Sequence, residues 1–149
     1  LEHLPLFAID LLIINEQNEI LLGKRVNAPA KGFWFVPGGR VFKNESLSDA
    51  FGRITKAELG IELPYLGASL LGLYDHFYSD SVFSDNISTH YINAAHVIKT
   101  NLLLKELPNL QHADYRWVAV NELDSEPDVH LYSKVFLQKL KDHLKNAGK

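Results

Sequence analysis

The sequence contains no cysteine and no methionine among its 149 residues. Without cysteine the protein has no disulfide scaffold, no zinc site built on thiolates and no cysteine nucleophile. The chain begins at Leu1, and because translation starts at a methionine codon we expect additional N-terminal sequence before it.

Long apolar runs and an excess of basic charge are also lacking. No stretch approaches the ~20 apolar residues of a membrane span, and the N-terminus lacks the pattern of a signal peptide. The net charge is −3, so no broad basic field attracts nucleic acid. These features predict a cytoplasmic protein that binds neither a membrane nor nucleic acid.

The remaining composition is that of an ordinary globular chain. Hydrophobic residues make up 46% of the sequence and charged residues 22%. A chain of this length buries roughly two thirds of the surface that it exposes when unfolded. We therefore expect one domain over residues 1–149.

Apolar segments separated by polar breaks predict six strands, the first two of which form a hairpin. The strands are expected at residues 6–15, 20–25, 33–36, 69–78, 89–98 and 115–120. Helical spacing covers residues 46–60 and a last segment that begins after Asp128. The expected inward positions of this last helix are Val129, Tyr132, Phe136, Leu140 and His143 or Leu144. Strands first, with one central and one terminal helix, predict an α+β sandwich.

The central helix has clear signals at both ends. Ser46 with Asp49 three residues later forms a capping-box pattern at its start. Gly60 followed by Pro64 ends it. The predicted apolar stripe consists of Leu47, Ala50, Phe51, Ile54 and Ile61.

One carboxylate interrupts this stripe. At 100° per residue, Glu58 lies within about 20° of Leu47, so it projects from the apolar face. It also stands in the last turn, where the helix dipole disfavours negative charge. A buried carboxylate needs an arginine, a proton or a metal ion, so a structural ion pair and a metal ligand both remain open.

The segment before the helix favours the metal. Residues 37–40, Pro-Gly-Gly-Arg, are expected to turn sharply out of a strand, and Glu45 lies just before the helix. Glycine lets the backbone approach a ligand closely, and carbonyl and carboxylate oxygens suit Mg²⁺. Together these residues fit the spacing G-x5-E-x7-R-x4-E-x-G, whose fixed positions are Gly39, Glu45, Arg53, Glu58 and Gly60.

This pattern resembles the signature of the Nudix hydrolases, which cleave nucleoside diphosphates linked to another group. The full signature has a glutamate after the arginine and two adjacent glutamates near its end. Here Ile54 follows Arg53, and Ala57 precedes the single Glu58. The departures put the usual cleavage at phosphorus by several metal ions in doubt.

The altered signature is similar to that of one subgroup, the GDP-mannose mannosyl hydrolases. Other stretches agree with this subgroup: Pro5 to Asp10, Leu22 to Arg25, Gly32 to Val41, His76 to Tyr78, Thr89 to Tyr91, Gln111-His112 and Asp114 to Trp117. The resemblance implies an α/β/α sandwich with a mixed sheet. It also implies a homodimer that hydrolyses a GDP-sugar, GDP-mannose or GDP-glucose, at the sugar C1–O bond with inversion. One divalent ion, Mg²⁺ or Mn²⁺, assists.

The resemblance also assigns metal ligands and phosphate-binding arginines. The metal ligands are the Gly38 carbonyl, Glu58 and Gln111. The arginines expected along the diphosphate are Arg25, Arg40 and Arg53. A planar guanidinium binds two phosphate oxygens at once, whereas a lone arginine is more often a surface charge or a structural partner.

The remaining site residues concern the water and the sugar. His112 is the expected general base, because an imidazole that titrates near neutral pH accepts a proton from water. Asp10, His76 and Tyr91 are expected to contact the sugar or the diphosphate. Tyr78 and the adjacent Phe77 are expected either to stack on guanine or to fill the core.

Three functions are consistent with these residues. The first is the Mg²⁺-dependent inverting hydrolase of a GDP-sugar. The second is an ordinary Nudix enzyme that cuts the phosphoanhydride of a nucleotide sugar, which the missing glutamates disfavour. The third is a binding module without catalysis, which the presence of Glu58, Gln111 and His112 disfavours.

Overall fold

The computed structural model describes residues 3–26, 31–79, 88–108 and 112–147, with positions 112 and 113 described by their backbone alone. The strands are β1 (Leu6–Ile14), β2 (Glu19–Arg25), β3 (Trp34–Phe35), β4 (Gly38–Arg40), β5 (Ser69–Tyr78), β6 (Thr89–Lys99) and β7 (His112–Ala119). The α-helices are α1 (Leu47–Leu59) and α2 (Leu137–Ala147). Short 3-10 helices are η1 (Tyr65–Gly67), η2 (Leu104–Glu106), η3 (Val120–Ser125) and η4 (Leu131–Ser133).

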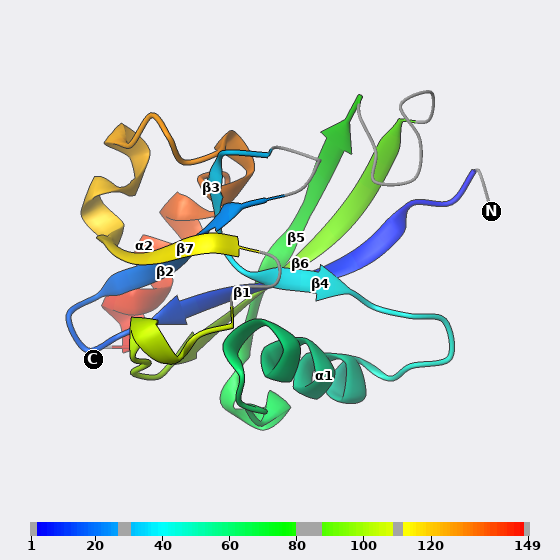
Figure 1. Cartoon of the computed structure of the whole chain (residues 1–149), viewed down its shortest axis with the longest axis horizontal. Coiled ribbons are helices and arrows are strands. Elements are labelled where there is room, and N and C mark those ends of the chain that lie inside the picture. The colour runs from blue at the N-terminus through cyan, green and yellow to red at the C-terminus, as the bar shows by residue number, and fades with distance from the viewer. Residues whose placement is uncertain (1–2, 27–30, 80–87, 109–111, 148–149) are drawn as a thin grey trace.

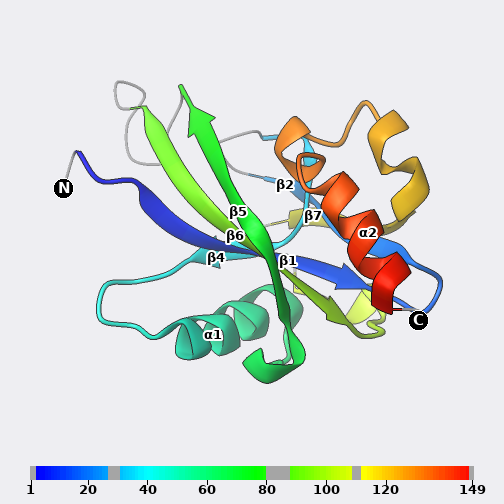
Figure 2. The same ribbon diagram turned by 180° about the vertical axis from the view of Figure 1, so that it is seen from behind.

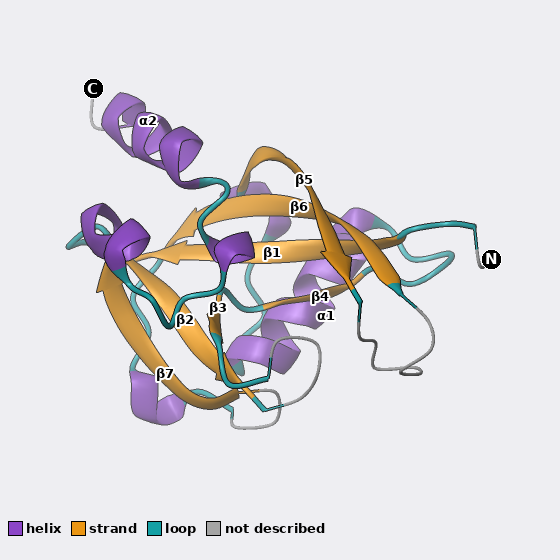
Figure 3. Cartoon of the chain, turned by 90° about the horizontal axis from the view of Figure 1, so that it is seen from above, coloured by secondary structure: helices purple, strands orange, loops and turns teal. Residues whose placement is uncertain are grey.

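The strands form a mixed sheet that divides in two. β1 pairs in parallel with β6 and antiparallel with β4, while β2 pairs antiparallel with β3 and β7. The predicted hairpin of β1 and β2 is confirmed, but the two strands share a single register pair, Ile14 with Ile20. Beyond that pair they diverge, as the view from above shows (Figure 3).

Helices cover both faces of the sheet, α1 on one and α2 on the other (Figure 1, Figure 2). Alternate residues of β1 serve the two cores. Leu12 and Ile14 pack with α2, and Leu11 and Ile13 pack with α1. Since both sides of β1 are buried, its sequence is a continuous apolar run. The predicted α+β sandwich with a mixed sheet is confirmed. Within the described residues, no helix is long and apolar enough to cross a bilayer.

Helix α1 has the predicted ends. The Ser46 hydroxyl accepts a hydrogen bond from the Asp49 N–H (3.0 Å), and Gly60 ends the helix with φ of 78°. The predicted stripe is correct in the middle of the helix, where Phe51 is fully buried. It is wrong at its two ends, because Leu47 is 43% exposed and Ile61 is 48% exposed. Only the stretch from Ala50 to Leu59 supplies the buried positions of α1.

Residues 38–40 of the predicted sharp turn form the strand β4. β4 pairs with β1, with Gly38 opposite Asp10 and Gly39 opposite Ile9. Glycine is needed at both positions: an added Cβ at Gly38 would lie 2.4 Å from the Ile9 carbonyl oxygen, and one at Gly39 would lie 3.0 Å from Ile54. The two glycines therefore serve close packing between strands and helix.

The last helix begins later than predicted, at Leu137 and not after Asp128. Main-chain groups of Asp128 and His130 bond to Trp34 of β3, and residues 131–133 form only the single 3-10 turn η4. The Asp128 carbonyl accepts from Trp34 N–H (2.9 Å), and His130 N–H donates to the Trp34 carbonyl (3.0 Å). The apolar residues of this segment are buried against β3 and the sheet. Their spacing in the sequence resembles that of one face of a helix.

Candidate functional site

One edge of β4 is open toward α1. The Leu11 N–H donates to the Pro37 carbonyl (2.8 Å), which marks one bonded position between β1 and the segment of β4. In an antiparallel pair, bonded positions alternate with positions whose N–H and C=O point away from the partner strand. Gly38 and Arg40 occupy these positions, so their main-chain groups face away from β1.

Two charged side chains of α1 contact this edge. The Gly38 N–H donates to Glu58 Oε1 at 3.1 Å. One turn earlier, Arg53 Nη2 donates to the Arg40 carbonyl at 2.7 Å. Glu58 is 7% exposed, as its place on the apolar stripe predicted. The structure thus brings together two of the three predicted metal ligands, Gly38 and Glu58.

The donor chemistry at this edge fits one hard cation. Glu58 supplies a buried carboxylate at the C-terminal end of α1, where a cation is favoured by the helix dipole. The Gly38 carbonyl lies on the same strand edge as its N–H and supplies a neutral oxygen. Nowhere in the described residues do three or more His, Cys, Asp or Glu side chains gather as a metal cluster. Such a set suits a single ion better than several.

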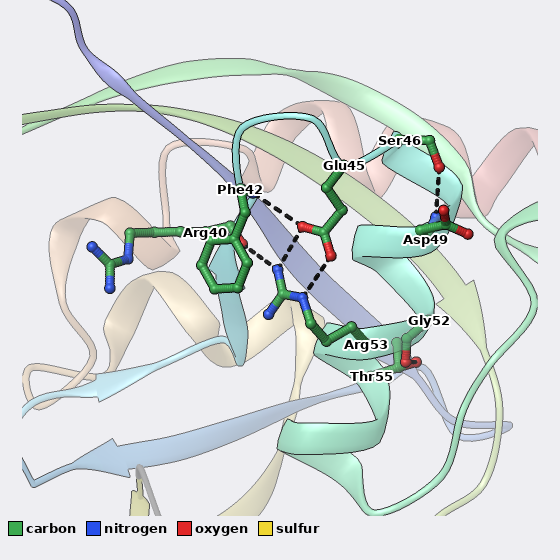
Figure 4. A network of polar contacts seen from close by, with 8 residues as sticks. All are labelled: Arg40, Phe42, Glu45, Ser46, Asp49, Gly52, Arg53 and Thr55. Carbon is green, nitrogen blue, oxygen red and sulfur yellow. Dashed lines mark hydrogen bonds and ion pairs between the residues drawn. The ribbon is translucent and has the colours of Figure 1, made fainter. Parts of the chain in front are cut away.

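Arg53 is held by the loop that precedes α1 (Figure 4). Its Nε and Nη2 donate to the two carboxylate oxygens of Glu45, at 2.7 and 2.9 Å. Its guanidinium also lies 3.9 Å from the ring centroid of Phe42. Hydrogen bonds from Arg53 and then from the Phe42 N–H lower the pKa of Glu45 to about 2. These contacts tie the loop to the helix.

The three predicted phosphate-binding arginines therefore differ in their surroundings. Arg53 has structural partners in the loop, and its contact with a diphosphate stays a prediction. Arg40 points away from the Arg53–Glu45 pair (Figure 4) and leaves β4 on the face shared with Asp10, because it lies opposite Ala8. Arg25 lies 5.8 Å above the Phe35 ring, and its buried Nε has no hydrogen-bond partner among the described residues.

Asp10 is a buried carboxyl on the α2 face of the sheet. It is 8% exposed, and Asn93 Nδ2 donates to its Oδ1 at 2.9 Å. Burial raises the pKa of Asp10 to about 7, against the opposing effects of the Asn93 hydrogen bond and the Arg25 charge. The Oδ1 of Asn93 is buried without a hydrogen-bond partner in the described part of the chain. Asp10 and Asn93 are thus a buried polar pair with an unsatisfied acceptor, which is typical of a binding site.

The other predicted sugar and base contacts lie on the same face. His76 is directly opposite Tyr91, and Tyr78 is two positions along β5 from His76. Burial, aided by the His130 charge, lowers the pKa of His76 to about 4, so its imidazole is neutral near pH 7. Burial raises the pKa of Tyr78, so its hydroxyl stays protonated. The structure thus gathers Asp10, His76, Tyr78 and Tyr91 on one face.

The aromatic residue next to Tyr78 belongs elsewhere. Phe77 is 61% exposed and stacks on His90, with ring centroids 4.4 Å apart. Since neighbouring residues of a strand point to opposite faces, Phe77 and Tyr78 do not line the same site. The core role is excluded for Phe77 by its exposure, and stacking of either ring on guanine stays a prediction.

Gln111 and the His112 side chain lie outside the described residues, so their predicted roles remain predictions. The described chain on either side approaches Glu58. The Tyr115 hydroxyl donates to the carbonyls of Glu58 (3.5 Å) and Pro108 (2.5 Å). Residue 108 also packs near the end of α1, 3.7 Å from where a Cβ of Gly60 would lie. Pro108 and Tyr115, the described residues that carry these contacts, both lie beside the end of α1.

Sequence reasoning missed two residues beside the candidate site, His130 and Tyr132. Both belong to the segment that is hydrogen-bonded to β3. The Tyr132 ring stacks on His76 with centroids 4.3 Å apart, and the His130 ring stacks on Phe35 at 4.5 Å. Tyr132 was expected to fill the core as part of a helix. The available signal was the presence of two rings with polar atoms, His130 and Tyr132, close together in the sequence. The helical spacing of the apolar residues around them concealed it.

The pKa of Asp10 predicts a distinctive pH dependence of stability. Between its ordinary value of 3.8 and about 7, the unfolded chain releases this proton and the folded chain keeps it. Taken alone, this group destabilises the fold by up to about 1.4 kcal/mol per pH unit as the pH rises through this window, whereas His76, whose pKa burial lowers to about 4, contributes the opposite slope. In urea unfolding at pH 4.5, 5.5 and 6.5, Asp10→Asn should therefore gain stability relative to wild type as the pH rises. Curves that stay parallel to wild type contradict the assignment, and Glu16→Gln, at an exposed turn, is the control.

Comparison with known proteins places the fold among characterised families. A family model of the NUDIX domain matches residues 5–140. The MutT NUDIX hydrolase from Burkholderia pseudomallei superposes with a TM-score of 0.70 at 24% identity, covering 92% of this chain and 98% of that one. The NUDIX domain of Shewanella oneidensis NrtR, complexed with ADP ribose, gives 0.65 at 16% identity, covering 95% and 89%. At these identities the likeness concerns the fold.

Sequence relatives are closer but partial. The chain is 45% identical over 93 residues to the low-salt glycan biosynthesis protein Agl8 of Haloferax volcanii, covering 62% of this chain and 58% of that protein. It is 44% identical over 70 residues to an ADP-ribose pyrophosphatase of Methanocaldococcus jannaschii, covering 47% and 40%. The matches thus span less than two thirds of either relative. Because the NUDIX match over residues 5–140 contains every strand of the described sheet and helix α1, the chain belongs to the Nudix hydrolase family.

Proposed function

We propose that the protein hydrolyses a GDP-sugar, GDP-mannose or GDP-glucose, at the sugar C1–O bond, with inversion and with one divalent ion. One observation carries the proposal: α1 turns a single carboxylate, Glu58, toward β4. The positions where the Nudix signature has further glutamates hold Ile54, which is buried in the core, and Ala57, which faces solvent. Cleavage at carbon needs fewer metal ions than cleavage at phosphorus, because the metal assists only the leaving group.

The leaving diphosphate needs its charge neutralised. Mg²⁺ or Mn²⁺, held by Glu58, the Gly38 carbonyl and Gln111, would supply positive charge to the departing oxygen. Arg25 and Arg40 supply guanidinium groups on the face of the sheet that carries Asp10. In this scheme Arg53 keeps the 40–46 loop in place through Glu45 and also reaches toward the diphosphate.

The sugar side of the site needs polar groups without strong charge. His76 is neutral near pH 7, and burial raises the pKa of Asp10 to about 7, so its carboxyl takes up a proton far more readily than an exposed aspartate. Asn93 and Tyr91 add an amide and a hydroxyl on the same face. These groups suit hydrogen bonds to sugar hydroxyls. A partly ionised carboxylate also stabilises positive charge that develops at C1 in the transition state.

The water requires a base, and we assign this role to His112. The water oxygen forms a bond to C1 while the bond from C1 to the diphosphate oxygen breaks. The imidazole takes the proton of the water, and the bonding electrons leave with GDP. The products are GDP and a hexose of inverted anomeric configuration, so atoms and charge balance without a further reactant.

The names of the relatives support two candidates. Agl8 is named for glycan biosynthesis, which fits an enzyme of nucleotide-sugar chemistry. The other relative is named an ADP-ribose pyrophosphatase, which favours phosphoanhydride cleavage as the second candidate function. The loss of carboxylates on α1 favours the first. A homodimer and a cytoplasmic location complete the proposal.

Hydrolysis of GDP-mannose in ¹⁸O-labelled water with Mg²⁺ separates these candidates. We expect the label in mannose and unlabelled GDP by mass spectrometry, since water attacks C1. Label in a phosphate would establish cleavage at phosphorus and support the second candidate. Binding of GDP-mannose without turnover would support a binding module instead.

The metal role of Glu58 predicts a change in Mg²⁺ dependence. Glu58→Gln keeps the shape and an oxygen that accepts from the Gly38 N–H, but removes the charge. We expect the Mg²⁺ concentration for half-maximal activity to rise about tenfold or more, because about 1.4 kcal/mol of lost affinity is tenfold in Kd. Glu62→Gln, an exposed position just past α1, is the matched control. An unchanged titration curve for Glu58→Gln would remove this residue from the metal site.

A further inference from the structure

The segment 128–133, here called the strap, connects the two halves of the divided sheet. At one end it is bonded to the β3 region, where Trp34 N–H donates to the Asp128 carbonyl and His130 N–H donates to the Trp34 carbonyl. The Val36 N–H donates to the buried hydroxyl of Ser133 at 3.1 Å. Three main-chain positions around β3 thus hold the strap in place.

At its other end the strap reaches β5 through Tyr132. The Tyr132 hydroxyl accepts from the Phe77 N–H and donates to the Phe77 carbonyl, both at 2.8 Å. β5 is the last strand of the sheet order, so this edge has no neighbouring strand in the described topology. A single side-chain hydroxyl therefore satisfies both main-chain groups of Phe77 at the open edge.

The same tyrosine presents its ring to His76. The two rings lie 4.3 Å apart at an angle of 6°, which is a face-to-face stack. His76 is 3% exposed, and its Nε2 is buried with no hydrogen-bond partner in the described part of the chain. A buried imidazole with an unpaired nitrogen is costly unless a ligand completes it. Its orientation relies on the ring packed against it.

The strap also fixes the neighbouring imidazole. The Tyr132 N–H donates to His130 Nδ1 at 3.1 Å, so the proton of neutral His130 resides on Nε2. Burial, and then the Arg25 charge, lower the pKa of His130 and keep it neutral. Its ring lies on Phe35, above which Arg25 also stands. Tyr132 thus joins the arginine side of the site to the His76 side.

We propose that Tyr132 is a positioning residue: its ring holds the His76 imidazole in the orientation in which Nε2 meets the bound nucleotide sugar. The inference deepens the proposed function and rests on it for the identity of the ligand. It assigns a role to the strap, which lies outside the Nudix signature and which sequence spacing places in a helix.

The experiment compares Tyr132→Leu with Tyr132→Phe, and Val135→Ala is the control. Phenylalanine keeps the ring stack on His76 and loses the two hydrogen bonds to Phe77. Leucine loses the stack as well as the hydrogen bonds. Val135 is 42% exposed and lies just beyond the strap. For Tyr132→Leu we expect kcat on GDP-mannose to fall by about 10- to 100-fold with little change in KM, because a misplaced group costs that much in rate. We expect Tyr132→Phe to retain most turnover.

Two further measurements distinguish positioning from general packing. In a double-mutant cycle, Tyr132→Leu should add little to the loss caused by His76→Ala, because the tyrosine acts through the histidine. In NMR spectra without substrate, nuclear Overhauser contacts between the His76 imidazole protons and the neighbouring Tyr78 ring should persist in Tyr132→Phe and be lost or changed in Tyr132→Leu.

Additive losses in the cycle, or contacts between His76 and Tyr78 that are unchanged in Tyr132→Leu, would overturn the proposal. If wild type does not hydrolyse GDP-mannose, the proposed function fails. The substrate-free spectra then still decide whether Tyr132 orients His76, so the two failures remain distinguishable.

Discussion

The open edge of β4 is the constraint on which the site depends. β4 is a three-residue strand, and its pairing with β1 leaves the main-chain groups of Gly38 and Arg40 directed away from β1. Helix α1 satisfies this edge with Glu58 on the Gly38 N–H and Arg53 on the Arg40 carbonyl. The contact with the Gly38 N–H places the buried Glu58 carboxylate at the strand edge that also carries the Gly38 carbonyl. This is the chemistry that a hard cation needs.

The same strand lies between Glu58, the proposed metal ligand, and Asp10, the proposed sugar contact. Gly38 lies opposite Asp10, and a Cβ at Gly38 would lie 3.1 Å from Asp10 Oδ1. The divided sheet allows this arrangement, since β1 leaves β2 after a single pair and takes β4 as its neighbour. The strap forms hydrogen bonds with both β3 and β5 and so connects the two halves of the sheet. In the proposed function, charge neutralisation and sugar recognition would therefore take place on either side of one short strand.

The sequence predicted those parts whose physics is local. Helix α1 and the burial of Glu58 follow from 3.6-residue spacing and capping residues, and the strands follow from apolar runs. β4 was missed because three residues with two glycines carry no strand periodicity. Its pairing depends on close approach to Ile9, which is a tertiary effect. The strap was missed because Val129 and Phe136, spaced as on a helix, are both buried in the core on the α2 side although helix α2 begins only at Leu137. The assignments of Arg25, His76 and Tyr91 came from the family resemblance and not from spacing.

A crystal soaked with Mn²⁺ and GDP tests the central claim directly, because anomalous scattering locates the ion. The account predicts one Mn²⁺ peak, coordinated by a Glu58 carboxylate oxygen and the Gly38 carbonyl at the open edge of β4. Two or more metal peaks along α1, or a single peak away from Glu58, would contradict it.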